Sequence, residues 1–218
     1  MRNDMNSLIR WISDAIWPVH CLGCGRSDDS WCADCRATLP NSPPPVRMNG
    51  SLDWLMTAGN LTTPLLRKAV WELKYRNRTR FERPLGDLLV RALGASGISI
   101  ANPLVVPVPL HSTRLRTRGY NQAELLARHI SRTCLWQLEI STLARIRATP
   151  SQVETSSREE RLANMAGVFQ VRDPGILSGK DVVLVDDVST TGATLDACAK
   201  ELKAGGTKSV VAAVVARG

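Results

Sequence analysis

The segment that most constrains the fold of this chain runs from residue 181 to residue 204. Residues 181–186 form a nearly continuous apolar run, which is typical of a parallel β-strand buried on both faces. Two adjacent carboxylates, Asp186 and Asp187, stand at its C-terminal end, and a short loop then leads into a helix. In open α/β sheets, ligands bind beyond the carboxyl ends of the strands. This segment is therefore the first candidate for a binding site.

Strands and helices alternate along most of the chain, which predicts an α/β fold with a parallel sheet flanked by helices. We expect strands over 52–60, 103–109, 140–146, 181–186 and 209–216, and helices over 64–75, 84–95, 121–133, 158–164 and 194–204. A proline-rich linker at 41–45 separates two parts. We expect an N-terminal module over residues 1–45 and an α/β domain over residues 46–218.

The N-terminal module begins with an amphipathic pattern over residues 5–17, where apolar side chains recur every three or four positions. Charged residues interrupt the pattern, so it does not resemble a signal peptide. No apolar run approaches the roughly 18 residues of a membrane span. We therefore expect a cytoplasmic protein with no membrane span.

Two CxxC pairs follow this pattern, and they consist of Cys21, Cys24, Cys32 and Cys35. Two pairs this close can place four thiolates tetrahedrally around one Zn²⁺, and four protein ligands make such a site structural. In a reducing cytoplasm a metal site is favoured over disulfides. Buried free cysteines or a thioredoxin-like redox pair are the alternatives. His20, directly before the first pair, is a neighbour that could replace one ligand.

The loop after the two acids has the composition of a phosphate cradle, because backbone amides at a helix N-terminus bind anions. Its hydroxyl, glycine and small residues are Ser189, Thr190, Thr191, Gly192, Ala193 and Thr194. The two carboxylates would repel a phosphate, so they suit sugar hydroxyls or a cation. A phosphorylated sugar satisfies both halves of the segment. The alternative is a capped helix that follows a strand with two solvated acids.

The net charge of +8 is concentrated in one part of the chain. Residues 67–132 carry 13 basic and 4 acidic side chains, whereas residues 133–218 carry 10 of each. A segment with such an excess needs an anionic partner. Arg114, Arg116 and Arg118 follow the expected strand 103–109, and arginine binds phosphate bidentately. A solvated surface face is the alternative for such a run.

Residues 183–194 resemble the phosphoribosyl-pyrophosphate (PRPP) signature of type I phosphoribosyltransferases. Other motifs extend this resemblance to the ComF/GntX-like family of competence-associated proteins with that fold. They are the paired CxxC module, LKYR at 73–76, VPVPL at 106–110, RGYNQA at 118–123 and a polar stretch over 152–169. The chain departs from the family pattern at Asn77, where glycine is usual, and at Val153-Glu154.

The resemblance implies a type I phosphoribosyltransferase fold with an N-terminal zinc-binding module, and a protein that binds PRPP and Mg²⁺. The 5′-phosphate would lie on the 189–194 loop, and the ribose hydroxyls on Asp186 and Asp187. Pyrophosphate would lie at the turn after strand 103–109, on His111, Ser112, Arg114 and Arg118. Residues 149–161 would form a lid that keeps water from an oxocarbenium-like sugar. The catalytic groups would be Arg158, Arg161 and Asp187, and a homodimer is compatible with the family.

Two functions fit these observations. The first is transfer of a phosphoribosyl group from PRPP to an unidentified acceptor in nucleotide-related metabolism. The second is a single-stranded DNA-binding accessory protein of DNA uptake that uses the fold without turnover, with competence-machinery proteins as partners. The basic segment 67–132 favours the second function, but an aromatic content of 5% offers few platforms for base stacking. A PRPP sensor without turnover is a third, weaker interpretation.

Overall fold

The structure is a computed structural model, and it describes residues 19–27, 29–75, 79–148 and 164–218. The chain divides into two compact units, Met1–Pro40 and Asn41–Gly218. The helix expected over 5–17 and the lid residues Arg158 and Arg161 lie outside the described residues. Within the described ranges, no helix is long and apolar enough to cross a membrane.

The first unit is organised around its cysteines. Its described part holds a short helix, α2 (Ala33–Ala37), and an isolated antiparallel bridge between His20 and Ser27. The described residues that it buries are Cys21, Ser30, Trp31 and Cys32. Small units with so few buried apolar side chains generally need a metal or disulfides for stability.

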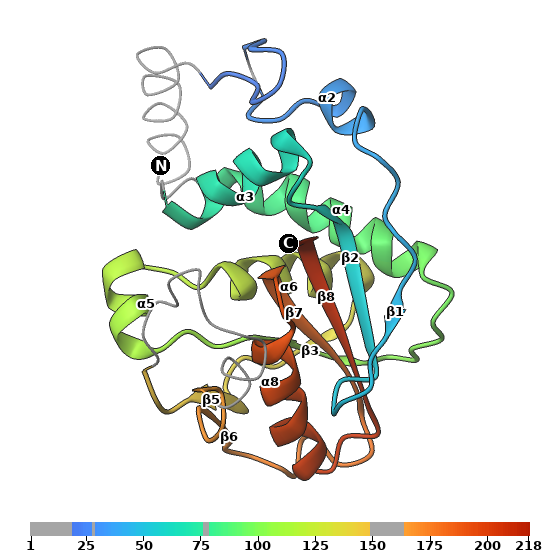
Figure 1. The fold of residues 1–218 in the computed structure, drawn as a ribbon, viewed down its shortest axis with the longest axis vertical. Coiled ribbons are helices and arrows are strands. Elements are labelled where there is room, and N and C mark those ends of the chain that lie inside the picture. Colours follow the sequence, from blue (N-terminus) through green and yellow to red (C-terminus); the bar gives the residue numbers. More distant parts are fainter. Residues whose placement is uncertain (1–18, 28, 76–78, 149–163) are drawn as a thin grey trace, which may run out of the picture. The chain divides into compact units, whose positions relative to one another are not determined.

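The second unit is built on a six-stranded sheet with the order β1-β2-β8-β7-β3-β4 (Figure 1). The strands are β1 (Val46–Arg47), β2 (Trp54–Asn60), β3 (Leu104–Pro107), β4 (Gln137–Leu138), β7 (Asp181–Ser189) and β8 (Ser209–Arg217). Neighbouring strands are parallel, except for β1 with β2. The predicted α/β fold with a mainly parallel sheet is therefore confirmed.

Helices cover both faces of this sheet. On one face α4 (Glu82–Ala95) and α6 (Gln122–Cys134) pack against each other and against the strands, and α8 (Ala193–Ala204) covers the other face (Figure 1). Helix α3 (Pro64–Tyr75) lies beyond the C-terminal ends of β7 and β8, and the 3-10 turn η1 (Thr79–Phe81) leads into α4. This arrangement places α3 over the strand end that carries the two acids.

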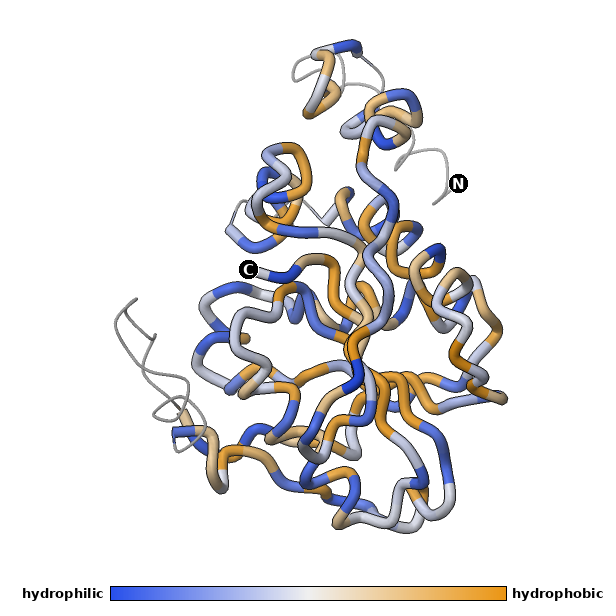
Figure 2. Tube along the Cα trace, turned by 45° about the vertical axis from the view of Figure 1, so that its right-hand side comes forward, coloured by the Kyte–Doolittle hydropathy of each residue, from blue (hydrophilic) through white to orange (hydrophobic). Residues whose placement is uncertain are grey.

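The central strands β7 and β8 are the most apolar part of the sheet. Val182, Val183, Leu184 and Val185 of β7 are fully buried. Figure 2 shows hydrophobic residues concentrated on the strands at the centre of this unit. Because side chains alternate along a strand, Val182 and Leu184 join the core beneath α8, and their neighbours face the other helices. The same alternation sets the directions of the two acids that follow.

Three short elements differ from the prediction. Residues 140–146 were expected as one strand of the sheet, but β5 (Leu143–Arg145) pairs antiparallel with β6 (Phe169–Val171) in a separate two-stranded sheet. Strand β4 takes the sheet edge beside β3. The segment after β3 is a helix, α5 (Ser112–Arg118), and not a turn. Segments this short contain too few residues to show a period in the sequence.

The close approach of α4 to α6 provides a test of the fold. A Cβ atom at Gly86 would lie 2.4 Å from Cδ2 of His129, whereas Gly94 in the same helix has open space around it. We predict that Gly86→Ala lowers the free energy of unfolding by about 1–3 kcal/mol because the two helices must separate. Gly94→Ala should instead raise it by up to about 1 kcal/mol. Urea denaturation measures both, and equal effects of the two substitutions would show that the helices do not pack in this way.

Candidate functional site

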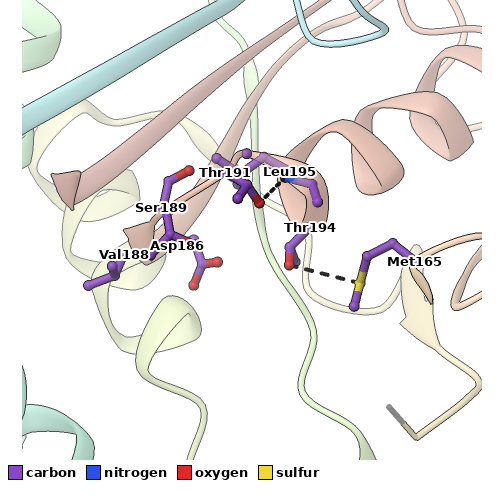
Figure 3. Close-up of a pocket in the computed structure, with 10 residues that line it drawn as sticks. Met165, Asp186, Val188, Ser189, Thr191, Thr194 and Leu195 are labelled. Atoms are coloured by element: carbon purple, nitrogen blue, oxygen red, sulfur yellow. Dashed lines mark hydrogen bonds between the residues drawn. The ribbon is translucent and has the colours of Figure 1, made fainter. Parts of the chain in front are cut away.

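The two acids at the C-terminal end of β7 point to opposite faces of the sheet, because successive side chains of a strand alternate. Asp186 lies on the α8 side and lines a small pocket with the loop that follows (Figure 3). Asp187 is buried on the other side, where its Oδ1 lies 2.9 Å from Nζ of Lys74 in α3. The end of the strand therefore offers one carboxylate on each side.

The charges of Asp186, Asp187 and Lys74 interact with one another. Burial of the Asp186 carboxyl, and then the negative charge of Asp187, raise the pKa of Asp186 to about 7. Burial lowers the pKa of Lys74, but the charge of Asp187 and its hydrogen bond outweigh burial, so the pKa of Lys74 is raised overall. Lys74 is thus a cation that neutralises Asp187, while Asp186 takes up a proton near neutral pH.

The loop between β7 and α8 forms the remaining wall of the pocket. Gly192, the N-cap of α8, has a φ of +82°, which would strain any other residue. The Thr191 hydroxyl accepts a hydrogen bond from the Ala193 N–H at 3.4 Å, and the Thr194 hydroxyl donates to Sδ of Met165 at 3.9 Å (Figure 3). The pocket has a volume of about 70 Å³. Sites that enclose whole ligands measure about 300–1,000 Å³, so this pocket suits one group of a larger ligand.

The pocket combines donors for an anion with one carboxylate. The first N–H groups of a helix have no acceptor within the helix, so the first turn of α8 provides donors. The hydroxyl of Ser189 is buried and has no hydrogen-bond partner in the described part of the chain. The predicted residues that the structure brings together here are Asp186, Ser189, Thr190, Thr191, Gly192, Ala193 and Thr194.

The start of α5 carries two further residues predicted to bind an anion. His111 is the N-cap of this helix, and its Nδ1 accepts a hydrogen bond from the Thr113 N–H at 3.4 Å. The same Nδ1 lies 2.8 Å from the Thr113 hydroxyl. Ser112, the first residue of the helix, is exposed. In this structure His111 therefore begins the helix, and Ser112 remains accessible to a ligand.

The two predicted arginines of α5 have different surroundings, and a third arginine lies nearby. Arg114 is exposed, whereas Arg118 lies over the ring of Tyr75, with its Cζ 5.5 Å from the ring centre. Arg145 in β5 was not singled out in the sequence. Its burial, and then repulsion by Arg114, lower the pKa of Arg145, and the charge of Asp186 acts in the opposite direction. Arg145 is thus close enough to Arg114 and Asp186 to feel both charges.

Four sulfur atoms gather in the first unit. The Sγ atoms of Cys21, Cys24, Cys32 and Cys35 all lie within 4.8 Å of one another. Sγ of Cys32 is 3.5 Å from that of Cys21 and 3.8 Å from that of Cys24. A tetrahedral ion with metal–sulfur bonds of about 2.3 Å holds its ligands about 3.8 Å apart, so these four thiols could bind one metal ion. Nδ1 of His20 instead lies 3.2 Å from the carbonyl oxygen of Gly25.

The backbone favours a thiolate at one of these cysteines. Burial raises the pKa of Cys21, but N–H groups of Gly23, Cys24 and Cys32 interact with its sulfur and lower the pKa to about 6. Hydrogen bonding to the Cys32 sulfur, followed by burial, raises the pKa of Cys35 to about 12. Thiolates are the form that binds metals, so a cation at the centre of the group would relieve the crowding of negative charge.

Comparison with known families agrees with this geometry. The profile of the phosphoribosyl transferase domain family matches residues 115–218, which include β7, the loop and α8. A solved glutamine phosphoribosylpyrophosphate (PRPP) amidotransferase from B. subtilis is 18% identical with a TM-score of 0.44, over 66% of this chain and 30% of that chain. The family match and the mainly parallel sheet define an α/β protein of the phosphoribosyltransferase fold class, and the described residues also include a four-cysteine group.

Two curated relatives identify the family more closely. DNA utilization protein YhgH of Salmonella typhi is 32% identical over 195 residues, which cover 87% of this chain and 80% of that protein. Competence protein F of Haemophilus influenzae is 30% identical over 199 residues, which cover 88% of this chain and 81% of that protein. The chain belongs to the ComF-like family of competence-associated proteins with a phosphoribosyltransferase fold. The predicted family is therefore confirmed.

The raised pKa of Asp186 predicts how stability depends on pH. This pKa is about 7 in the folded chain and about 3.9 for an unperturbed aspartate. The folded chain therefore holds the proton longer, and wild-type stability falls as the pH rises between these values. Asp186→Asn removes this loss, so its advantage in melting temperature over wild type should grow from pH 5 to pH 8. Thermal unfolding at both values measures the effect, with exposed Asp173→Asn as the control. An advantage that stays constant would contradict the shift.

Proposed function

We propose that this protein binds PRPP with Mg²⁺ at the C-terminal edge of its sheet and transfers the phosphoribosyl group to an acceptor. The observation that carries the proposal is the pocket in which Asp186 faces the hydroxyl-rich loop at the start of α8. The 5′-phosphate of the ligand would accept hydrogen bonds from the loop at residues 189–194. The sugar attached to it would then lie at the end of β7.

The alternation of Asp186 and Asp187 suits a ribose, which carries two neighbouring hydroxyl groups. A ribose that lies across the end of β7 would meet one carboxylate on each side. Its hydroxyls donate best to ionised carboxylates, so binding favours proton release from Asp186. Contact with Asp187 requires that Lys74 share this carboxylate or leave it. A displaced Lys74 would be attracted to the pyrophosphate, and Asp187 would then stabilise positive charge on the sugar.

The pyrophosphate would lie between α5 and β5, where cationic side chains meet. Arg114 and Arg145 support this position because their positive charges repel each other, and a bound pyrophosphate would offset this repulsion. His111, Ser112 and Arg118, which the sequence predicts for the same role, are the N-cap, the first and the last residue of α5. Mg²⁺ bound with PRPP would offset the charge of the leaving group and keep most of its ligands as water.

In the transfer itself, the bond between C1 of the ribose and the pyrophosphate oxygen breaks, and pyrophosphate leaves with the electron pair. A new bond forms between C1 and the acceptor, which loses a proton. Arg158 and Arg161 would be the lid residues that exclude water from the cationic sugar, as the family resemblance implies. The printed names of the relatives connect them to competence and DNA utilization. We therefore propose that this chain acts on products or intermediates of DNA use, with a nucleobase or an amine as acceptor.

A screen of PRPP consumption across nucleobases and amines would identify the acceptor.

Calorimetry with two ligands tests the proposed division of the site. We predict that Asp186→Asn weakens both Mg²⁺–PRPP and ribose 5-phosphate by about 10- to 100-fold, because hydrogen bonds to a charged group are lost. Arg145→Met should weaken PRPP by a similar factor and leave ribose 5-phosphate within about twofold. Arg172→Met, at an exposed arginine beyond β6, is the charge control. Unchanged PRPP affinity in Asp186→Asn would refute the sugar site.

The ion in the four-cysteine group is proposed to be a structural Zn²⁺. Protein purified without chelator should contain about one equivalent of zinc, and Cys24→Ser should lower both the zinc content and the melting temperature. Cys134→Ser, at a cysteine in α6 outside the group, should change neither. Metal analysis by mass spectrometry measures this, and less than about half an equivalent in the wild type would count against the site.

A further inference from the structure

The outer face of α3 presents two aromatic side chains next to each other. Trp71 is 45% exposed and Tyr75 is 63% exposed. Their ring centres lie 5.8 Å apart with an angle of 44° between the ring planes. The two residues are four positions apart, so they share one face of the helix. Exposed apolar groups that lie together generally mark an interaction site.

A guanidinium group and a hydrogen bond keep this cluster in place. Cζ of Arg118 lies 5.5 Å from the centre of the Tyr75 ring, within the range of a cation–π contact. Nη1 of Arg118 also donates to Oε1 of Gln122 at 2.7 Å. The hydroxyl of Tyr120 donates to the carbonyl oxygen of Leu73, which joins the end of α3 to the segment between α5 and α6. The Tyr75 ring of α3 and the Arg118 guanidinium of α5 are therefore held in place by contacts of both helices.

Basic side chains stand on both helices that meet at this cluster. Arg67 and Lys68 of α3 are exposed, and so are Arg114 and Arg116 of α5. The acid within α3, Glu72, is buried. The exposed face of α3 is therefore positively charged as well as aromatic. A surface that combines cations with aromatic rings has the two features by which proteins bind single-stranded nucleic acids.

We infer that Trp71 and Tyr75, with Arg118, form a stacking site for the bases of a single-stranded nucleic acid. The exposed side chains of Arg67, Lys68 and Arg116 would contact its phosphates. A free nucleobase would leave these cations without a role, and a duplex keeps the faces of its bases inside the stack. A single strand is the ligand that uses both the rings and the charges. The site shares Arg118 with the proposed pyrophosphate position, but it shares no residue with the pocket at β7, and the inference does not require PRPP binding.

The test uses the full chain and a fluorescently labelled oligothymidylate, with anisotropy measured across a range of salt concentrations. Trp71→Ala and Tyr75→Ala should each weaken binding by about 5- to 100-fold, because a stacked base is lost. Tyr75→Phe keeps the ring and should bind like the wild type. Neither alanine substitution should change the slope of log affinity against log salt. Arg67→Ala and Arg116→Ala should each reduce that slope by about 1 if they contact phosphates.

A matched control and a second ligand separate the possible outcomes. Leu135 is 88% exposed at the C-cap of α6, so Leu135→Ala removes exposed apolar area away from the cluster and should bind like the wild type. Affinity for PRPP should be unchanged in Trp71→Ala, so failure of PRPP binding affects only the proposed function. Wild-type affinity in both alanine variants, or no binding by the wild type, overturns the stacking site. Loss of affinity together with a lower melting temperature or zinc content also overturns it, because the rings would then pack within the protein.

Discussion

The ion pair between Lys74 and Asp187 allows the fold to place two adjacent acids at the end of its most buried strand. An uncompensated buried charge costs several kcal/mol. Lys74 compensates one of the two acids from α3, and a proton compensates Asp186 near neutral pH. The same contact helps to hold α3 over the end of β7. It thereby positions the face of α3 that carries Trp71 and Tyr75, so both candidate sites depend on one interaction.

Alternation along β7 gives the two acids different roles. Asp186 belongs to the pocket of the 189–194 loop, whereas Asp187 is held by a cation from another element. A ligand that brings its own cation and an anionic leaving group could exchange partners with the ion pair between Lys74 and Asp187. Asp187 would then lose its neutralising partner Lys74 only when the ligand is bound. This is the feature we would expect in a site that must stabilise a cationic sugar briefly and in the absence of water.

Long regular segments could be predicted from the sequence, and contacts between distant segments could not. Helix α3 has the bounds that its apolar period predicts, and β7 and β8 begin where their apolar runs begin, because such patterns report burial directly. The pairing of β5 with β6 left no pattern, so Arg145 was not recognised near Asp186. The sequence indicates Lys74 only as part of a basic helix, since nothing local connects it to Asp187. Low aromatic content predicts few stacking platforms, but composition cannot show that two rings share one exposed face.

A crystal structure of the chain with Mg²⁺ and PRPP tests most directly whether the end of β7 holds a phosphorylated sugar. We predict a 5′-phosphate on the backbone amides of residues 190–194 and the two ribose hydroxyls within hydrogen-bond distance of Asp186 and Asp187. Nζ of Lys74 should have moved from its position 2.9 Å from Asp187 toward the pyrophosphate. A phosphate bound elsewhere, or a ribose that contacts neither acid, would contradict this account of the site.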